Sequence, residues 1–234
     1  MRNPLDLDNS AALLEQVNQA LNSAKPLRIQ GANSKAFLGR PMAGDVLDTR
    51  AHRGIVSYDP TELVITARCG TPLAEVQEVL DAAQQMLPCE PPSFGPGATV
   101  GGMLASGLSG PRRPWAGAVR DYVLGTRVIT GHGKHLRFGG EVMKNVAGYD
   151  VSRLMAASYG VLGVITEVSL KVLPKPRKCL SISLEIDTDR ALLRLAEWGQ
   201  QPQPAQRRPA RRTQRLSGIA GNSPGAYRAE NTVS

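Results

Sequence analysis

The sequence predicts a protein of the α+β class, in which helices and strands alternate irregularly. Its 234 residues include 41% hydrophobic residues and 24 glycines, which is typical of a globular enzyme with a real core. Apolar residues recur at helical spacing in some segments and alternate with polar residues in others. The three cysteines are far apart and form no Cys-x-x-Cys pair, which favours a reducing compartment and argues against zinc or iron–sulfur ligation.

The first elements follow from this periodicity. A helix over residues 10–24, capped by Ser10, places Leu13, Leu14, Val17 and Leu21 on one face. Residues 27–30 form a short strand that ends in a polar loop at 31–35. Residues 54–58 and 62–67 read as two strands joined by a turn at 59–61, and Thr71 and Pro72 then start a second helix.

The second half continues the alternation. A strand at 121–130 turns back through residues 131–134 into a strand at 135–138. Asp150 caps a helix that ends near residue 158, with Gly160 as its left-handed stop. Alternating polarity predicts a half-buried strand at 164–172. A strand at 181–186 and a helix at 189–198 then begin a new unit.

A glycine-rich segment, residues 91–110, is the most informative part of the chain. Val100, Met103, Leu104 and Leu108 keep it apolar, so it is not a flexible linker. Glycine allows backbone N–H groups to approach a pyrophosphate closely, and consecutive N–H groups bind anions. The loop at 31–35, with Ser34 and Lys35, is a weaker phosphate-binding signal of the same kind. Two such loops predict a long dinucleotide such as FAD.

The third glycine-bearing region runs from Asn145 to Asp150 and resumes at residues 160–165. A helix bracketed by glycine turns accounts for most of it. Gly163, inside a strand pattern, indicates close approach by a planar ligand or by another backbone segment. No metal site is expected, because His132 and His135 flank an exposed turn without a third ligand, and His52 is predicted at the surface.

These segments resemble a known family. The hairpin and helix that begin at Gly54, the run Gly97–Gly102, and the pair Gly148–Asp150 and Gly160–Glu167 are similar to signatures of the vanillyl-alcohol oxidase, or PCMH-type, FAD-binding superfamily. Residues 34–41, 108–121 and 144–150 resemble more closely the family of glycolate oxidase FAD-binding (E) subunits. The resemblance covers roughly residues 5–200, and three motifs in the same order make it specific.

The resemblance implies a fold of two α+β subdomains with FAD between them. It places pyrophosphate at the Gln30–Lys35 loop and the 97–110 segment, and the flavin or ribityl end near 163–165. The loop contains no histidine, so a covalent histidyl–flavin bond is not expected there. The predicted cofactor residues are Gln30, Gly31, Ala32, Asn33, Ser34, Lys35, Gly97, Thr99, Val100, Gly101, Gly102, Ser106, Gly107, Gly110, Gly148, Tyr149, Gly160, Gly163, Val164 and Ile165.

The resemblance also implies a function and partners. The chain would be the FAD-binding subunit of a glycolate oxidase complex, an oxidoreductase that converts glycolate, a 2-hydroxy acid, to glyoxylate. Its partners would be a second flavoprotein subunit and an iron–sulfur subunit, which pass electrons toward quinone. A cytoplasmic location is expected, with peripheral membrane association through the complex. No catalytic acid or base is identified, and Arg112 and Arg113 are open to either a carboxylate-binding or a solvated surface role.

The domain organisation follows from the loss of pattern near the end. We expect an FAD-binding domain at 1–178, the start of an incomplete, truncated cap domain at 179–202, and a basic tail at 203–234 that is disordered or out of frame. The tail holds six arginines and one glutamate and so carries most of the net charge of +8. No aromatic residue is interleaved among those arginines, so specific nucleic-acid binding is not expected.

Besides a nonspecific, salt-sensitive nucleic-acid-binding role for the arginine tail, two alternatives to the complex subunit remain open from the sequence. One is a stand-alone FAD-dependent 2-hydroxy-acid dehydrogenase, which would oxidise glycolate or lactate by itself with a dye acceptor. The other is a nonenzymatic scaffold subunit with a vestigial flavin site, which would be colourless when purified yet assemble with its partners.

Overall fold

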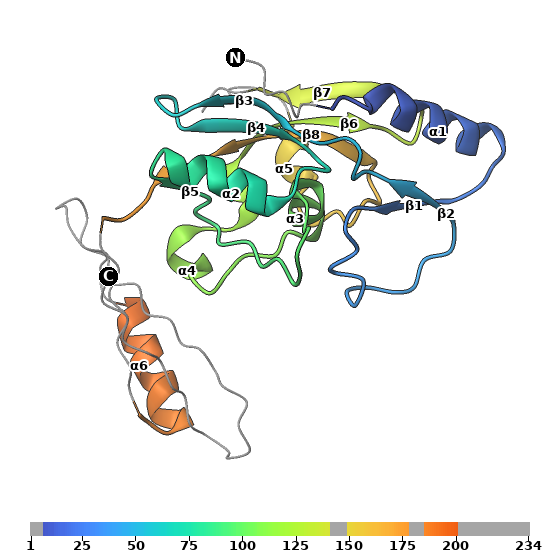
Figure 1. Ribbon diagram of the computed structural model, residues 1–234. Coiled ribbons are helices and arrows are strands. Elements are labelled where there is room, and N and C mark those ends of the chain that lie inside the picture. The colour runs from blue at the N-terminus through green and yellow to red at the C-terminus, as the bar shows by residue number, and fades with distance from the viewer. Residues whose placement is uncertain (1–6, 141–148, 178–184, 201–234) are drawn as a thin grey trace. The chain divides into compact units, whose positions relative to one another are not determined.

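A five-stranded antiparallel sheet is the centre of the larger unit of this protein. A computed structural model describes residues 7–140, 149–177 and 185–200. The sheet order is β3-β4-β8-β6-β7. Its strands are β3 (Ile55–Asp59), β4 (Val64–Arg68), β6 (Val123–Ile129), β7 (His135–Gly139) and β8 (Val164–Lys171). The main core lies between this sheet and the helices α2 (Leu73–Ala82) and α3 (Val100–Ser106), which lie on one of its faces (Figure 1).

A second, smaller core forms around the N-terminal elements. The helix α1 (Ser10–Asn22) buries Leu13 and Val17 against Leu47, Ile129 and Val164. The strands β1 (Leu27–Gln30) and β2 (Asp45–Asp48) pair in parallel beside it. Mixed helices and strands around two hydrophobic cores confirm the predicted α+β fold class. The parallel strand β2 was not predicted from the sequence.

The remaining elements are short. They are β5 (Gln85–Met86), paired with β9 (Leu173–Pro174), α4 (Arg113–Ala116), the 3-10 helix η1 (Val119–Tyr122) and α5 (Val151–Leu154). A second compact unit begins at Lys175 and contains α6 (Thr188–Gln200), which includes the helix predicted at 189–198. The strand predicted at 181–186 lies mostly outside the described residues, and the domain boundaries predicted at 178 and 202 stay predictions.

Several local expectations are wrong at the residue level. Thr71 does not cap α2, which begins at Leu73, because its hydroxyl bonds both to the N–H and to the carbonyl of Gly54. Ser10 lies inside α1, whose N-cap residue is Asn9. The helix capped by Asp150 ends at Leu154, well before residue 158.

The sheet also differs in burial and length from what was expected. The strand β8 is buried from Val164 to Leu170 rather than half-buried, and a buried polar residue on it has a partner, since the Ser169 hydroxyl lies 2.9 Å from that of Thr66 on β4. The strand β6 begins at Val123, two residues later than predicted, since Asp121 and Tyr122 belong to the 3-10 helix that precedes it.

Candidate cofactor site

The loop after β1 presents a row of backbone donors. Its N–H groups, Gly31 to Lys35, have no hydrogen-bond partner in the part of the chain that the structure describes. Asn33 adopts the left-handed conformation with φ of +58°, as Asn tolerates better than Ala, and its carbonyl accepts the N–H of Ala36. Five successive unpaired N–H groups and the Lys35 ammonium make this loop suited to an anion.

The glycine-rich segment uses its N–H groups differently. Thr99 caps α3, and its hydroxyl accepts the Gly102 N–H at 3.2 Å. The Val100 N–H donates to the Thr71 carbonyl at 2.9 Å and the Gly101 N–H to the Cys69 carbonyl at 2.8 Å. The first N–H groups of α3 are therefore satisfied inside the protein. The N–H groups of Gly101 and Gly102 are therefore not free donors, and the assignment of both residues to the cofactor site stays a prediction.

The third segment, residues 157–163, packs against the end of α3. The Ala157 N–H donates to the Leu104 carbonyl at 3.0 Å, and the Tyr159 N–H to the Ala105 carbonyl at 2.9 Å. Gly107 adopts φ of +63°, and a Cβ added there would lie 2.6 Å from the Cβ of Ala157. This contact requires glycine on both conformational and steric grounds.

All three segments contact one another. A Cβ on Gly31 would lie 2.6 Å from the Thr99 hydroxyl, and one on Gly97 would lie 3.6 Å from the Ala32 Cβ. A Cβ on Gly160 would lie 3.1 Å from Ile29, the residue two before Gly31 in the chain. The fold thus brings the first loop, the α3 segment and the 157–163 segment together, although the first and the last lie more than 120 residues apart in the sequence.

Other predicted cofactor residues have structural partners. The side chains of Val100, Val164 and Ile165 belong to the two cores. The Ser106 hydroxyl donates to the Met103 carbonyl at 3.1 Å. Gly163 approaches another backbone segment, since a Cβ there would lie 2.6 Å from the Ile129 carbonyl oxygen, and this is one of the two readings that the sequence left open.

The remaining predicted residues lie beside the three segments or away from them. Gln30 ends β1, and its carbonyl accepts the Thr49 N–H. Gly110 packs against Glu90, which forms a 3.3 Å ion pair with Arg112 and so gives that arginine a partner. Tyr149 is 97% exposed, and its side chain makes no hydrogen bond or ring contact with the described residues. Gly148 lies outside the described residues.

Sequence reasoning missed two features of this region. Ser158 is buried, and its hydroxyl has no hydrogen-bond partner among the described residues, which is unusual for a buried polar atom. Phe37 and Phe94 are exposed and contact each other beside the first loop. A phenylalanine in each of two otherwise small or polar loops was the available sequence signal for this pair.

Three buried titratable groups, Cys69, Cys89 and His52, are neutral at pH 7. Burial raises the pKa of the Cys69 and Cys89 thiols to about 12, so neither is a nucleophile at neutral pH. Burial also lowers the pKa of His52 to about 4, with the charge of Arg68 adding to the effect. The prediction that His52 lies at the surface is wrong, because its side chain is 1% exposed and its Nδ1 accepts the Asn9 N–H.

Two further observations limit the chemistry of the site. The described ranges hold no cluster of three His, Cys, Asp or Glu side chains that could ligate a metal ion. His135, expected on an exposed turn, is half-buried, and its Nε2 lies 2.9 Å from the Thr166 hydroxyl. Within the same described ranges no helix is long and apolar enough to cross a membrane.

These residues fit a dinucleotide with a pyrophosphate and flat rings. The unpaired N–H groups of the first loop and the Lys35 ammonium suit the pyrophosphate. The orphan Ser158 hydroxyl can donate a hydrogen bond to a cofactor atom, which would satisfy it. Exposed apolar side chains such as Phe37, Phe94 and Tyr159 border the same segments and suit the ring systems.

Comparison with known proteins gives the same cofactor. The family described as "FAD binding domain" matches residues 7–139. Glycolate oxidase subunit GlcE of Escherichia coli is 67% identical over 199 residues, which are 85% of this chain and 57% of that subunit. D-lactate dehydrogenase of Anaerostipes hadrus is 36% identical over 128 residues, or 55% of this chain and 26% of that enzyme.

More distant relatives define the fold. Glycolate oxidase subunit GlcD of Bacillus subtilis is 34% identical over 52% of this chain and 26% of its own length. A solved structure of alkyldihydroxyacetonephosphate synthase superposes with a TM-score of 0.58 at 21% identity, covering 73% of this chain and 31% of that one. The chain thus spans little more than half of the E. coli subunit and less of the others. It belongs to the FAD binding domain family, with the PCMH-type fold and FAD as its cofactor.

Proposed function

We propose that this chain is the FAD-binding subunit of a glycolate oxidase complex, located in the cytoplasm. The similarity to the E. coli GlcE subunit, at 67% identity, supports this assignment more than any other observation. At the structural level, the proposal rests on the five unpaired N–H groups of the Gly31–Lys35 loop, which the fold places against Thr99.

In this proposal each of the three segments has a different role in binding FAD. The first loop and Lys35 hold the pyrophosphate, because they supply the unpaired donors and a positive charge. The α3 segment supports that loop through Thr99, and the 157–163 segment contributes the Ser158 hydroxyl. Bound FAD supplies the hydride-accepting chemistry that converts a 2-hydroxy acid to a 2-oxo acid. The chain's residues bind and orient it without a covalent bond.

Partner subunits complete the proposed activity. The E. coli and B. subtilis relatives are both named as glycolate oxidase subunits, which supports an assembly with a second flavoprotein. An iron–sulfur subunit would take the electrons onward. We assign no catalytic acid or base to this chain, so glycolate oxidation is a property of the complex in this proposal.

Two measurements test the proposal separately. The purified chain should show flavin absorption bands, and denaturation followed by filtration should release the flavin into the filtrate. The reconstituted complex should then reduce a dye acceptor when glycolate is added. Lys35→Met should lower both flavin content and glycolate-dependent reduction, whereas Lys134→Met, on the exposed β6–β7 turn, should change neither. A complex that contains flavin in this chain but never oxidises glycolate would contradict the proposed substrate.

The similarity to D-lactate dehydrogenases supports a second candidate, a free-standing FAD-dependent 2-hydroxy-acid dehydrogenase. This candidate predicts that the isolated chain reduces a dye with D-lactate or glycolate. Activity only after the partner subunits are added favours the complex subunit. Activity of the isolated chain, with an unchanged rate on adding partners, favours the dehydrogenase.

A further inference from the structure

Phe37 and Phe94 form an exposed aromatic pair that joins two loops. Their ring centroids lie 5.1 Å apart in an edge-to-face arrangement, with 76° between the ring planes. Yet the two side chains remain 65% and 53% exposed. Burial of apolar side chains is favourable, so two adjacent rings left open to water form an apolar surface suited to binding another molecule.

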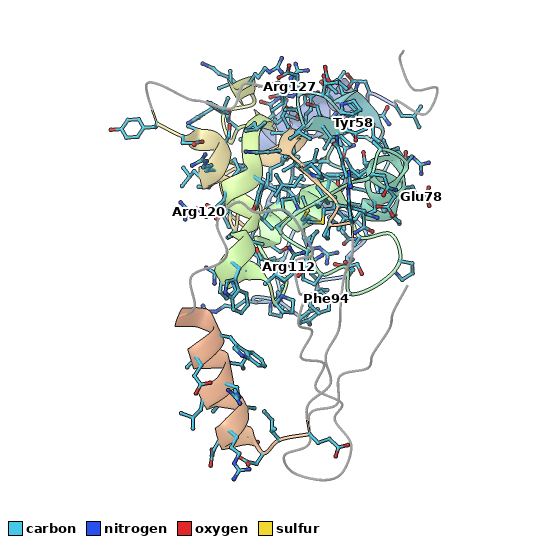
Figure 2. The ribbon with its side chains drawn as sticks, turned by 90° about the vertical axis from the view of Figure 1, so that its left-hand side faces the viewer. Tyr58, Glu78, Phe94, Arg112, Arg120 and Arg127 are labelled. Atoms are coloured by element: carbon cyan, nitrogen blue, oxygen red, sulfur yellow. The ribbon has the colours of Figure 1, made fainter. Side chains whose placement is uncertain are left out.

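The aromatic pair borders the loop with the unpaired N–H groups. Phe37 follows Lys35 by two residues, and Phe94 directly precedes Gly95. A Cβ on Gly95 would lie 3.9 Å from the Ser34 Cβ, so the Phe94 loop runs beside the first loop. Figure 2 shows Phe94 and Arg112 at the same end of this unit, away from Tyr58 and Arg127.

A positive charge lies over one of the rings. The Lys35 Nζ is 5.9 Å from the centroid of the Phe94 ring, which is within cation–π range. The loop therefore combines unpaired N–H groups, an ammonium group and an adjoining aromatic surface. A ligand that fits this combination has an anionic phosphate a short distance from a planar ring. Each half of FAD meets that description.

We propose that Phe37 and Phe94 form an aromatic wall of the cofactor site, against which one planar ring of FAD packs while Lys35 binds the neighbouring phosphate. This inference rests on the FAD-binding part of the proposed function and is independent of glycolate as the substrate. The ring is the isoalloxazine or the adenine, which share the planar chemistry that the wall recognises. The fragments FMN and ADP distinguish the two.

The decisive experiment measures FAD affinity in variants of the full chain after its flavin is removed. Titration followed by flavin fluorescence should give a dissociation constant roughly 10-fold higher for Phe94→Ala and higher again for the double variant with Phe37→Ala. Phe94→Tyr should stay close to the unsubstituted chain, because it keeps the ring. Leu136→Ala is the matched control, since Leu136 is an exposed apolar residue (40%) on β7.

Folding and ligand source are resolved in the same experiment. Because both rings are largely exposed, the thermal midpoints of the flavin-free variants should stay close to that of the unsubstituted chain. If the double variant binds FMN more weakly than the unsubstituted chain does, the ring that packs on the wall is the isoalloxazine. If it binds ADP more weakly, that ring is the adenine.

Three results would overturn the inference. One is a double variant whose dissociation constant for FAD stays within twofold of that of the unsubstituted chain. The inference is overturned in that case even if the double variant no longer assembles with its partner subunits. Another is unchanged competition by both FMN and ADP. The third is an unsubstituted chain that binds no FAD, which would also contradict the proposed function. Normal FAD binding without glycolate oxidation would contradict only the substrate of the proposed function and leave the aromatic wall standing.

Discussion

The first loop and the start of α3 both contain glycine beside the candidate site, but they differ in whether their backbone N–H groups are hydrogen-bonded. From Gly31 to Lys35 the N–H groups lack partners among the described residues, whereas those of Val100 and Gly101 bond to carbonyl groups of the protein. A Cβ on Gly101 would lie 2.8 Å from the Cys69 Cβ, so glycine there permits close packing. Both segments therefore use glycine for close packing, since a Cβ on Gly31 would lie 2.6 Å from the Thr99 hydroxyl, but only the first loop leaves its N–H groups without partners among the described residues.

This difference separates stability from ligand binding. Changes in the packed segment should lower the free energy of unfolding, because they force backbone or core atoms apart. Changes in the loop should lower FAD affinity with little effect on folding, because the loop N–H groups and the Lys35 ammonium make no hydrogen bond or ion pair within the described chain. The following predictions test that separation.

The largest effect is expected at the C-terminal end of α3. Gly107→Ala should lower the free energy of unfolding by roughly 3 kcal/mol, because it combines an unfavourable φ of +63° with a 2.6 Å contact to Ala157. Urea denaturation of the flavin-free chain measures this loss.

Two other glycines serve as matched controls for that prediction. Gly39→Ala should lose only about 1 kcal/mol, since its φ is +82° but no atom lies within 4 Å of an added Cβ. Gly131→Ala has open space and no positive φ, so it should be near neutral. Equal stabilities of the Gly107 and Gly131 variants would refute the packing role.

Acid should lower the free energy of unfolding through a buried group of the packed framework, His52. The folded pKa of His52 is about 4, lowered from 6.5 by burial and by the charge of Arg68. Below pH 6.5 the unfolded chain therefore binds a proton that the folded chain does not, and the free energy of unfolding falls as pH drops from 6.5 to 4. With allowance for solvent screening, the loss is on the order of 2 kcal/mol.

A second acidic step and a control sharpen this prediction. Burial raises the pKa of Asp8, but hydrogen bonds from Ser10 and the charges of Arg68 and His52 outweigh it and lower that pKa to about 2. Stability from Asp8 should therefore disappear between about pH 4 and pH 2. His52→Asn keeps an acceptor for the Asn9 N–H but does not titrate, so its stability should vary less between pH 6.5 and 4. An unchanged slope in that variant would show that other groups cause the loss.

On the loop side, Lys35→Met should weaken FAD binding about 10-fold by removing a charge-assisted contact with phosphate. Burial lowers the pKa of Lys35, so removing its charge should leave the stability of the flavin-free chain equal or slightly higher. Isothermal titration with FAD and a parallel thermal melt measure both quantities. Lys134→Met is the control for charge alone. A large loss of stability without a loss of affinity would reverse the roles assigned to the two segments.

The local pattern of the sequence was sufficient for the glycine segments and most strands. Alternation of polarity located β8, and the polar turn at 59–61 located the β3–β4 hairpin, because both signals are local. The strand β2 was missed, since Asp45 and Asp48 break its apolar pattern and its pairing with β1 is a tertiary contact. Burial of His52 also depends on distant Asn9.

Whether each backbone N–H group is hydrogen-bonded within the protein also could not be predicted from the sequence. Gly101 and Gly31 look alike in the sequence, yet only the fold brings Cys69 to Gly101 and leaves Gly31 unbonded. Thr71 had the position of a helix cap but bonds to Gly54, because the β3 strand begins beside it. Local residue types therefore predicted three segments that the fold brings together, and tertiary contacts decided which of their atoms remain available to a ligand.

The smallest effect is expected at Ser158, which lies neither in the first loop nor in α3. The Ser158 hydroxyl is buried without a partner in the described chain, and such an atom is destabilising by roughly 1–3 kcal/mol. Ser158→Ala should therefore leave the flavin-free chain equally stable or up to about 1 kcal/mol more stable, while FAD affinity falls about threefold.

Ser106→Ala is the control, because that buried hydroxyl already donates to Met103 and its loss should lower stability instead. If Ser158→Ala destabilised the flavin-free chain as Ser106→Ala does, its hydroxyl would be part of the packed framework. The segments of the two serines are joined by the Tyr159 N–H, which donates to the Ala105 carbonyl at 2.9 Å. Opposite changes in stability for these two buried serines would therefore show that the free Ser158 hydroxyl is available to the cofactor.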